Sequence, residues 1–295
     1  MTGDALPPIK SPIKRARATK MQVEERRSAL RDIVADMQPM TVRQVFYQAT
    51  VKGIVEKTEA GYTKVQTDLV FMRKFGFLPY DWLADNTRWQ RKPRSFNGIE
   101  EALQDTAKFY RKNLWASADC YVEVWLEKDA LAGVVFPVTA AYDVRLMVAR
   151  GYASLSFLHT AAEYIRSLDV PTYLYHLGDF DPSGVNASEK IEETLRELAP
   201  DADIEFERIA VRSWQIEEWN LPTRPTKASD TRSKKFGDIS VELDAIDPDR
   251  LRSLVTAAIE NHLPNQQLTI LKAAEQSERE IIHQLIGSAI DRGRR

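Results

Sequence analysis

The stretch HLGDFDPSG, His176–Gly184, decides the fold that we expect for this chain. It ends a run of β-formers that begins at Thr172, and it leads into a helix-like stretch over residues 183–198. Side chains alternate along a strand, so Asp179 and Asp181 are expected on the same side, at the carboxyl end of a parallel strand. Open α/β sheets bind ligands at that edge, and two carboxylates there suit a hard cation such as Mg²⁺. The alternative is structural, with Asp181 as the N-cap of the next helix and Asp179 as a turn residue.

A third carboxylate, Glu127, follows the apolar strand YVEVWL in the sequence WLEKDAL. It too is expected at the carboxyl end of a strand, so that Glu127, Asp179 and Asp181 can converge on one or two Mg²⁺ ions. Such ions stabilise the attacking and leaving oxygens of phosphoryl transfer. We expect no cation of the chain to pair with these carboxylates, so removing one should leave the metal-free protein no less stable. The alternative for Glu127 is an acid at a helix start, where the helix dipole favours negative charge.

The second half of the chain alternates between β-forming and helix-forming stretches. This alternation predicts an α/β fold with parallel βαβ units in an open sheet flanked by helices. A mostly helical extension, 248–290, follows and is broken at Pro264. With a helical first half, the whole chain is then α+β. The expected strands are 120–126, 144–148, 172–177 and 204–209, and the expected helices between them are 155–168 and 183–198.

The first half is expected to form a small helical domain. Gln38-Pro39 ends one helix, and Thr41 is placed to cap the next. Three short helices followed by a loop dense in arginine and lysine suggest a helix-turn-helix of the winged type. The expected helices are 20–37, 42–51 and 62–75, with a turn at 59–61 and a further helix at 99–112. The expected domains are a basic arm at 1–19, a winged-helix domain at 20–98, a linker helix at 99–115 and a sheet domain with its extension at 116–295.

Composition excludes several classes of protein. Of the 295 residues, 43% are hydrophobic and 28% are charged, which is ordinary for a globular chain and unlike disordered or collagen-like chains. The single Cys120 excludes an intramolecular disulfide and any CxxC motif. P-loop, HExxH and GxSxG motifs are absent. The longest nearly apolar stretch, 131–142, is too short to cross a bilayer, so we expect a cytoplasmic protein with no membrane partner.

The net charge of −2 hides an asymmetry. Residues 1–115 hold 21 Lys and Arg against 13 Asp and Glu, whereas residues 116–295 hold 20 against 30. A basic front half predicts a polyanion partner, with double-stranded DNA as the candidate, and chance segregation of solvated faces is the alternative. Basic tracts at 88–94 and 224–235 are either DNA contacts or solvated loops. The candidate DNA-contact residues are Arg88, Arg91, Lys92, Arg94, Lys227 and Arg232.

Three short motifs resemble the Toprim domain, the metal-binding fold shared by topoisomerases, primases and some nucleases. Glu127 in WLEKDAL, RGYAS at 150–154, and Asp179 and Asp181 in GDFDPSG carry the resemblance. The RGYAS and DFDPSG motifs are most similar to the A subunit of topoisomerase VI and its relative, the meiotic double-strand-break transesterase. The later LPTRPTKASD and VELDA resemble the same group. The resemblance implies a Toprim domain that binds Mg²⁺ through the three carboxylates.

The sequence TVRQVFYQ, Thr41–Gln48, resembles the winged-helix domain of the same family. That domain has an arginine four residues before a nucleophilic tyrosine, which implies that Tyr47 is the nucleophile and Arg43 the phosphate clamp. Residues i and i+4 share a helix face, so both side chains can meet one phosphate. The family has two tyrosines where this chain has Phe46-Tyr47, and the second one attacks. The alternative is that Phe46 and Tyr47 are core aromatics of a small domain.

The resemblance covers residues 40–250 and implies a Mg²⁺-dependent enzyme that cleaves DNA as a homodimer and leaves 5′-phosphotyrosyl ends. In that family the tyrosine of one subunit works with the metal site of the other. We expect this protein to be cytoplasmic and associated with the nucleoid. The short chain is most similar to a stand-alone, mini-A type of relative, which leaves an ATPase B-type partner subunit open. Two other functions also stay open. One is a Toprim nuclease of a defence or mobile-element system, in which water attacks, and the other is a non-catalytic DNA-binding subunit.

Overall fold

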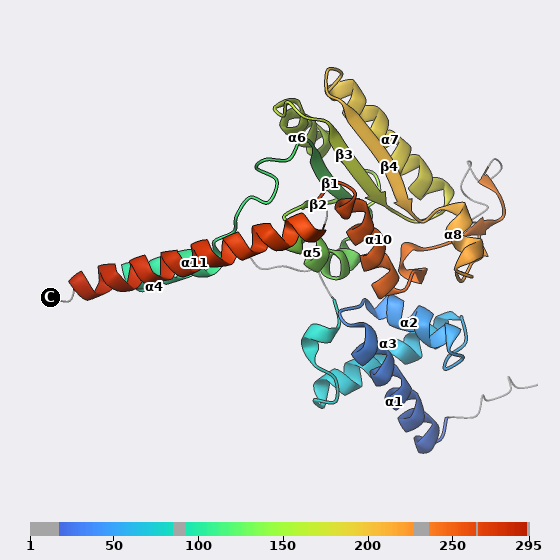
Figure 1. Ribbon diagram of the computed structural model, residues 1–295. Helices are drawn as coiled ribbons and strands as arrows, with labels where there is room; N and C mark the ends of the chain where they lie inside the picture. Colours follow the sequence, from blue (N-terminus) through green and yellow to red (C-terminus); the bar gives the residue numbers. More distant parts are fainter. Residues whose placement is uncertain (1–17, 85–92, 227–235, 264, 294–295) are drawn as a thin grey trace, which may run out of the picture.

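The computed structural model describes residues 18–84, 93–226, 236–263 and 265–293. These residues form a helical unit and a sheet unit, with a long helical arm that projects from the sheet unit (Figure 1). No helix of these described residues combines the length and the apolar character that crossing a membrane requires. Three expectations concern residues outside the described ranges: most of the basic arm, the loop 85–92 of the expected wing, and the basic tract at 227–235.

The centre of the sheet unit is a four-stranded parallel sheet with the strand order β2-β1-β3-β4. The central strands pair in register, with Trp125 opposite His176 and His176 opposite Arg208. All four carboxyl ends therefore meet at one edge of the sheet. The parallel α/β sheet expected from the sequence is confirmed. Its strands are β1 (Tyr121–Leu126), β2 (Arg145–Val148), β3 (Thr172–Leu177) and β4 (Ile204–Ala210).

Two helices cover one face of the sheet, α6 (Leu155–Arg166) and α7 (Pro182–Leu198). The buried core on this face includes Trp125 of β1, Leu158 of α6 and Ile191 of α7. Each helix lies in a crossover between parallel strands, as βαβ units require. Because α7 begins soon after β3 ends, this packing also fixes the short loop between them.

The opposite face of the sheet packs against α5 (Ala132–Ala141) and α10 (Pro248–Glu260). Val124 and Leu126 of β1 point to this face because strand side chains alternate. The sequence analysis did not predict α5, whose apolar residues form no periodic stripe and which contains Pro137. Packing against β2 and α10 stabilises this helix despite its interior proline.

The helical unit consists of three helices around a core of their own. The helices are α1 (Lys20–Met37), α2 (Val42–Val51) and α3 (Glu59–Lys74), followed by a 3₁₀ turn at Tyr80–Trp82. Each helix begins at a threonine whose side chain accepts a backbone N–H of the first turn, namely Thr19, Thr41 and Thr58. Leu30 of α1 and Leu69 of α3 belong to the shared core. Two of the three expected helices are confirmed with the expected bounds.

The third helix begins earlier than expected. Residues 59–61, which the sequence analysis assigns to a turn, form the first turn of α3, because the Thr58 hydroxyl accepts the Gly61 N–H at 3.1 Å. A Cβ at Gly61 would lie 2.1 Å from the carbonyl oxygen of Glu56. The glycine is therefore required by the close approach of the preceding loop, and it does not end a helix.

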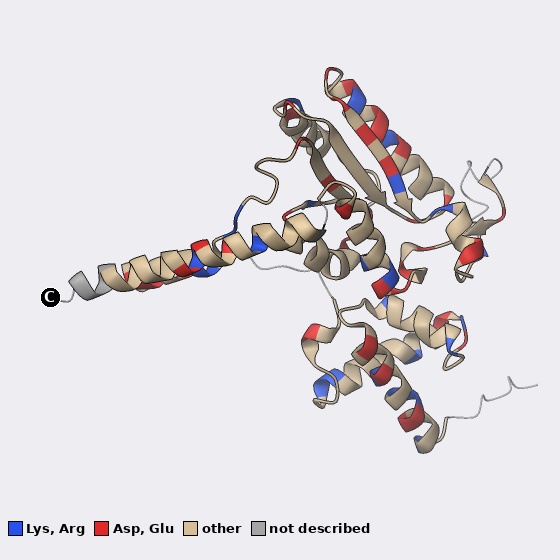
Figure 2. Cartoon of the chain, in the orientation of Figure 1, with Lys and Arg blue, Asp and Glu red and all other residues tan. Residues whose placement is uncertain are grey.

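The arm pairs α4 (Ile99–Phe109) with α11 (Asn265–Gly293), which lie side by side (Figure 1). The Tyr110 hydroxyl donates to Glu278 at 2.5 Å, and the Lys112 N–H donates to Glu275 at 2.9 Å. These contacts end α4 before residue 112, the expected end, and tie the following segment to α11. Figure 2 shows acidic and basic residues interspersed along the arm and along α7. Part of the acidic excess of the second half therefore lies on solvated helix faces.

Candidate active site at the carboxyl edge of the sheet

Asp179 lies in the loop between β3 and α7. Its Oδ1 accepts the Leu243 N–H at 2.8 Å and lies 2.9 Å from Lys128 Nζ. Arg208, on β4, donates to the backbone carbonyls of Gly178 and Asp179 and so fixes this loop. Burial raises the pKa of Asp179, although Lys128 opposes the shift. Asp179 is thus a buried ionisable group with a fixed orientation.

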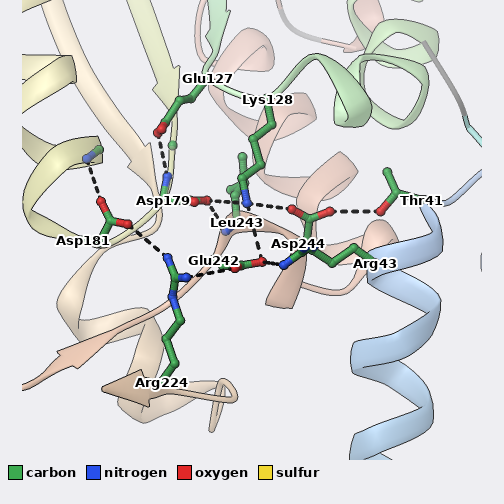
Figure 3. Close-up of polar contacts among 12 residues, drawn as sticks. Thr41, Arg43, Glu127, Lys128, Asp179, Asp181, Arg224, Glu242, Leu243 and Asp244 are labelled. Carbon is green, nitrogen blue, oxygen red and sulfur yellow. Dashed lines mark hydrogen bonds and ion pairs between the residues drawn. The ribbon is translucent and has the colours of Figure 1, made fainter. Parts of the chain in front are cut away.

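Asp181 is the N-cap of α7. Its Oδ1 accepts the Gly184 N–H at 2.8 Å, which is the structural role that the sequence analysis weighed as the alternative. Its Oδ2 lies 3.1 Å from Arg224 Nη2. Figure 3 shows that Asp179 turns toward Lys128, whereas Asp181 turns toward Arg224. The two carboxylates therefore lie at one sheet edge but contact different cations.

Glu127 lies directly after β1, and its Oε2 accepts the Asp179 N–H at 2.9 Å. A Cβ at Gly178 would lie 2.5 Å from this oxygen, and a Cβ at Gly184 would lie 3.1 Å from it. The two glycines of GDFDPSG thus make room for the carboxylate. Burial first, and the charge of Asp179 second, raise the pKa of Glu127. Among the described residues, no Lys or Arg forms an ion pair with it.

Two further carboxylates, Glu242 and Asp244, reach the same edge. The segment that carries them pairs with the loop after β3, because Phe180 and Val241 exchange backbone hydrogen bonds of 2.8 and 2.9 Å. Leu243, between the two acids, is buried in the core. From the sequence alone, this segment carries only a resemblance, and no role is predicted for either acid. The alternation of acid, leucine and acid in VELDA was the available signal.

Lys128 places a positive charge among these carboxylates. Its Nζ lies 2.9 Å from Asp179, 2.9 Å from Asp244 and 3.8 Å from Glu242 (Figure 3). The expectation that no cation of the chain pairs with the carboxylates is therefore wrong. Burial lowers the pKa of Lys128, but Asp244 and Asp179 more than compensate and hold it above its usual value. Its place directly after Glu127 was the only signal in the sequence.

A second cation, Arg224, bridges two acids of the site. It lies 3.1 Å from Asp181 and 3.2 Å from Glu242. It is held by a two-stranded antiparallel sheet of β5 (Arg224–Pro225) and β6 (Ile239–Ser240). The first residue of the second basic tract therefore binds protein carboxylates in this structure.

The first turn of α2 lies against the carboxylates of the sheet edge. The Thr41 hydroxyl donates to Asp244 Oδ1 at 3.0 Å, and Arg43 Nη1 donates to Glu242 Oε2 at 2.7 Å (Figure 3). The Arg43 side chain is 44% exposed, whereas that of Glu242 is 8% exposed. The 3₁₀ turn Leu243–Ala245 packs against α2 beside these contacts. Arg43 thus reaches the sheet edge through Glu242, and of the three predicted carboxylates only Asp179 lines a common cavity with it.

Tyr47 lies one turn further along α2 and is only 5% exposed. Its ring packs with the core of the sheet unit, whereas the neighbouring Phe46 belongs to the core of the helical unit. Burial first, and the charge of Glu242 second, raise the pKa of Tyr47 to about 12. Lys57 Nζ lies 5.6 Å from the ring centroid. The buried ring fits the core alternative, and its position on the helix that carries Arg43 fits the predicted nucleophile.

A cavity of about 680 Å³ opens between α2 and the carboxyl edge of the sheet. Residues of both units line it, including Arg43, Tyr62, Lys128, Asp179 and Glu242. A ligand in this cavity has access to the Arg43–Glu242 pair and to the Lys128–Asp179 pair at the same time.

The carboxylates do not form a ready-made metal centre. Within the described ranges, no group of three or more His, Cys, Asp or Glu side chains is arranged to hold a metal ion. The chemistry of the donors nevertheless suits Mg²⁺, which prefers carboxylate oxygens. Asp179 is buried and Glu127 is partly buried, and the charge of Asp179 raises the pKa of Glu127. Lys128 pairs with Asp179, and among the described residues no cation pairs with Glu127, so the negative charge that remains fits a divalent cation beside these two residues.

Of the six candidate DNA-contact residues, the structure describes only Arg94. Its side chain is 66% exposed, lies 3.2 Å from Asp105 and stands 4.5 Å from the Phe109 ring centroid. The remaining five lie outside the described residues, namely Arg88, Arg91, Lys92, Lys227 and Arg232.

Comparisons with known proteins do not assign the chain to a family. No protein-family model matches it, and no curated protein sequence matches it. A functional assignment therefore depends on the geometry of the site and on the motifs that it brings together.

Proposed function

We propose that this protein is a Mg²⁺-dependent DNA-cleaving transesterase that resembles the A subunit of topoisomerase VI, with a winged-helix domain followed by a Toprim domain. The observation that carries the proposal is the Arg43–Glu242 ion pair at 2.7 Å, which holds the first turn of α2 against the carboxylates of the sheet edge. A guanidinium and several carboxylates at one cavity, with a phenol on the adjoining helix, suit phosphoryl transfer on DNA.

The proposed nucleophile is Tyr47. Its phenol oxygen forms a bond to a DNA phosphorus while the bond from that phosphorus to the 3′ oxygen breaks. The phenol proton passes to solvent, and the departing 3′ oxygen takes up a proton. The product is a 5′-phosphotyrosyl end, an ester that can be resealed. Because burial raises the pKa of Tyr47 to about 12, we propose that its ring moves toward water before it attacks.

Arg43 is the proposed phosphate clamp. A guanidinium matches the geometry of a phosphate with two parallel hydrogen bonds. Arg43 lines the cavity and keeps 44% of its side chain exposed while it contacts Glu242. Once released from Glu242, it can bind the phosphate and favour the phenolate of Tyr47, which lies four residues along the same helix.

The proposed metal ligands are Glu127 and Asp179, with Asp181 as the third. When bound there, Mg²⁺ supplies positive charge that stabilises the oxygens that gain charge during phosphoryl transfer. The chain itself orients these ligands: the Asp179 N–H fixes Glu127, and Arg208 fixes the loop that carries Asp179. Asp181 has one oxygen committed to the cap of α7, and its other oxygen pairs with Arg224, so a metal would have to displace Arg224 from that second oxygen.

We further propose that the protein acts on double-stranded DNA in the nucleoid as a homodimer. Each subunit carries one Tyr47, so breaking both strands requires two copies. In the family that the chain resembles, the tyrosine of one subunit serves the metal site of the other. An ATPase B-type subunit would be required only for strand passage, which this proposal does not include.

A second candidate function is a Toprim nuclease in which water attacks the phosphorus. The observation that favours it is the burial of the Tyr47 ring at 5% exposure, which is the position of a packing residue. In this alternative, the carboxylates and the proposed Mg²⁺ site are the same, and Arg43 still contacts the phosphate. The two functions differ in the chemical nature of the DNA ends.

The test is to incubate the protein with supercoiled plasmid and Mg²⁺, stop the reaction with detergent, and compare the products with and without protease. DNA that enters the gel normally only after protease treatment carries a protein-linked end, as the transesterase predicts. Free ends without protease support the nuclease. Plasmid that is bound but not cut would contradict both the transesterase and the nuclease. The non-catalytic DNA-binding subunit would then be the function that fits.

A further inference from the structure

Lys128 lies where a metal bound to Asp179 would have to compete with it. We infer that Lys128 is an internal counter-ion, which neutralises the site when no divalent cation is bound and which a divalent cation must displace from Asp179. This inference rests on the metal site of the proposed function. It goes further by assigning a role to Lys128 and by connecting metal binding to the release of Arg43.

The first step concerns the positions of the charges. The Lys128 Nζ lies 2.9 Å from Asp179 Oδ1, and this oxygen also accepts the Leu243 N–H at 2.8 Å. The Lys128 side chain is 24% exposed, and that of Asp179 is 11% exposed, so water screens their interaction only in part. A divalent cation on Asp179 would stand beside the ammonium and repel it. The two cations therefore exclude one another at this carboxylate.

The second step concerns where Lys128 can go. Its ammonium already lies 2.9 Å from Asp244 and 3.8 Å from Glu242 Oε2. The same Oε2 accepts the hydrogen bond from Arg43 at 2.7 Å. A shift of Lys128 away from Asp179 and toward Glu242 thus brings it onto the oxygen that Arg43 occupies.

The third step concerns α2. Two polar contacts hold its first turn to the carboxylates, Thr41 to Asp244 and Arg43 to Glu242. When Lys128 replaces Arg43 as the ion-pair partner of Glu242, Arg43 is free to bind a phosphate in the cavity that Arg43 lines. Metal binding then loosens a contact that holds α2, the helix that carries Tyr47, to the sheet edge, through the chain of contacts from Asp179 to Lys128, Glu242 and Arg43.

The first experiment measures Mn²⁺ binding by calorimetry in the absence of DNA, for the wild type and for Lys128→Met, with Lys190→Met on α7 as the matched control. Lys190 is exposed and forms an ion pair with Glu193 on the same helix, so its loss should not change the affinity. An internal competitor reduces the apparent affinity in proportion to the fraction of sites that it leaves free. We expect Lys128→Met to bind Mn²⁺ about tenfold more tightly than the wild type, and Lys128→Arg to bind no more tightly than the wild type.

The second experiment uses the wild type alone, so it remains informative even if Lys128→Met does not fold. Hydrogen exchange of the peptide that covers α2 is measured with and without Mn²⁺. We expect faster exchange in α2 with Mn²⁺, and unchanged exchange in α6, which is remote from these contacts.

The outcomes separate the inference from the proposed function. Equal Mn²⁺ affinity in the wild type and Lys128→Met, or α2 exchange that Mn²⁺ leaves unchanged or slows, would overturn the inference and leave the metal site standing. The absence of Mn²⁺ binding in both proteins would overturn the metal site and the inference together. Glu127→Gln should weaken Mn²⁺ binding in either background, which confirms that the measured site is this one.

Discussion

The Arg43 guanidinium donates to the Glu242 carboxylate at 2.7 Å, although 199 positions separate the two residues in the chain. Glu242 also lies 3.2 Å from Arg224 and 3.8 Å from Lys128. Together with Asp244, which accepts a hydrogen bond from Thr41, it is a carboxylate at which the helical unit and the sheet unit meet. Burial raises the pKa of Glu242, but Lys128 and Arg43 outweigh burial and hold the pKa below its usual value. Glu242 is accordingly ionised at neutral pH and keeps the two units together.

Replacement of Asp179 should destabilise the metal-free protein. Asp179→Ala leaves the Lys128 ammonium and the Leu243 N–H without their shared acceptor. Breaking such a partly buried pair should lower the free energy of unfolding by about 2–3 kcal/mol. Urea unfolding in EDTA measures this loss, with Asp201→Ala in an exposed loop as the control.

Asp179→Ala and Lys128→Met should destabilise the protein by less together than the sum of their separate losses, because the two residues share the 2.9 Å ion pair, although Lys128→Met also takes the cation from Asp244. If Asp179→Ala is as stable as the wild type in EDTA, the carboxylates repel one another as the sequence alone suggests, and the ion pair to Lys128 contributes nothing.

Thr41 should stabilise the protein more than a cap alone does. Its hydroxyl oxygen accepts the Gln44 N–H at 3.0 Å, and its hydroxyl proton goes to Asp244. Thr58 caps α3 through Gly61 and provides the matched control. Thr58→Ala should cost about 1 kcal/mol by removing a cap, and Thr41→Ala about 1 kcal/mol more because it also removes a hydrogen bond to a carboxylate. Thermal or urea unfolding of the two variants compares them, and equal losses of stability would mean that the Asp244 hydrogen bond is not stabilising.

His176 should make the protein sensitive to mild acid. It is fully buried on β3, and neither ring nitrogen has a hydrogen-bond partner among the described residues. Burial first, and Arg208 second, lower the pKa of His176 to about 3. The folded pKa lies below the unfolded value of about 6.5. The stability that comes from keeping His176 neutral in the folded state is therefore fully present above pH 6.5. It declines as the pH falls from 6.5 toward 3.

Between pH 7 and pH 5, this single group should cost the wild type about 2 kcal/mol of unfolding free energy. His176→Leu should lose correspondingly less over the same interval, and His283→Leu, at an exposed position of α11, should behave as the wild type. Parallel pH profiles for the wild type and His176→Leu would show that His176 is not held neutral by the fold.

DNA binding should depend on salt and only weakly on sequence. The basic excess of residues 1–115 predicts that this half binds DNA phosphates, with the tract 88–94 as the first candidate. Neutralising Arg88, Arg91 and Lys92 together should reduce the slope of log K against log salt by about 0.9 for each phosphate that the protein no longer neutralises. Fluorescence anisotropy over a salt series measures the slope. An unchanged slope would mean that these three residues do not contact DNA phosphates, and Lys227 and Arg232 in the second basic tract would be the next candidates.

Much of the fold could be predicted from local patterns. β3 ends where its β-formers end, and α2 begins at Thr41 as expected, because caps and strand composition are local signals. The start of α3 was missed because a glycine such as Gly61 is typical of a turn, whereas here a close approach to the Glu56 carbonyl requires it. A local pattern of residue types cannot predict such a close contact between two parts of the backbone.

The site was predictable only in part, and for a similar reason. Glu127 and Asp179 follow strand ends, so a parallel sheet brings them to one edge. The acids from the VELDA segment and the arginine of β5 reach that edge through long-range pairing, such as the bridge between Phe180 and Val241, which no local period encodes. Lys128 was misjudged because sequence adjacency to Glu127 does not say which carboxylates a flexible side chain will contact.

The most direct test of the proposed function is whether Tyr47→Phe still forms a covalent adduct with DNA. The substitution keeps the ring, which packs 5.6 Å from that of Phe46, and removes a hydroxyl that makes no hydrogen bond to a described residue. The free energy of unfolding should therefore change by less than about 1 kcal/mol. Tyr62→Phe, at the other ring that contacts Phe46, is the matched control.

The measurement compares protein–DNA adducts and plasmid nicking for the wild type, Tyr47→Phe and Tyr62→Phe with Mg²⁺ at equal folded fractions. The account predicts adducts and breaks for the wild type and Tyr62→Phe, and neither for Tyr47→Phe. A Tyr47→Phe protein that cuts DNA at close to the wild-type rate would contradict it, since water would then be the nucleophile at this site.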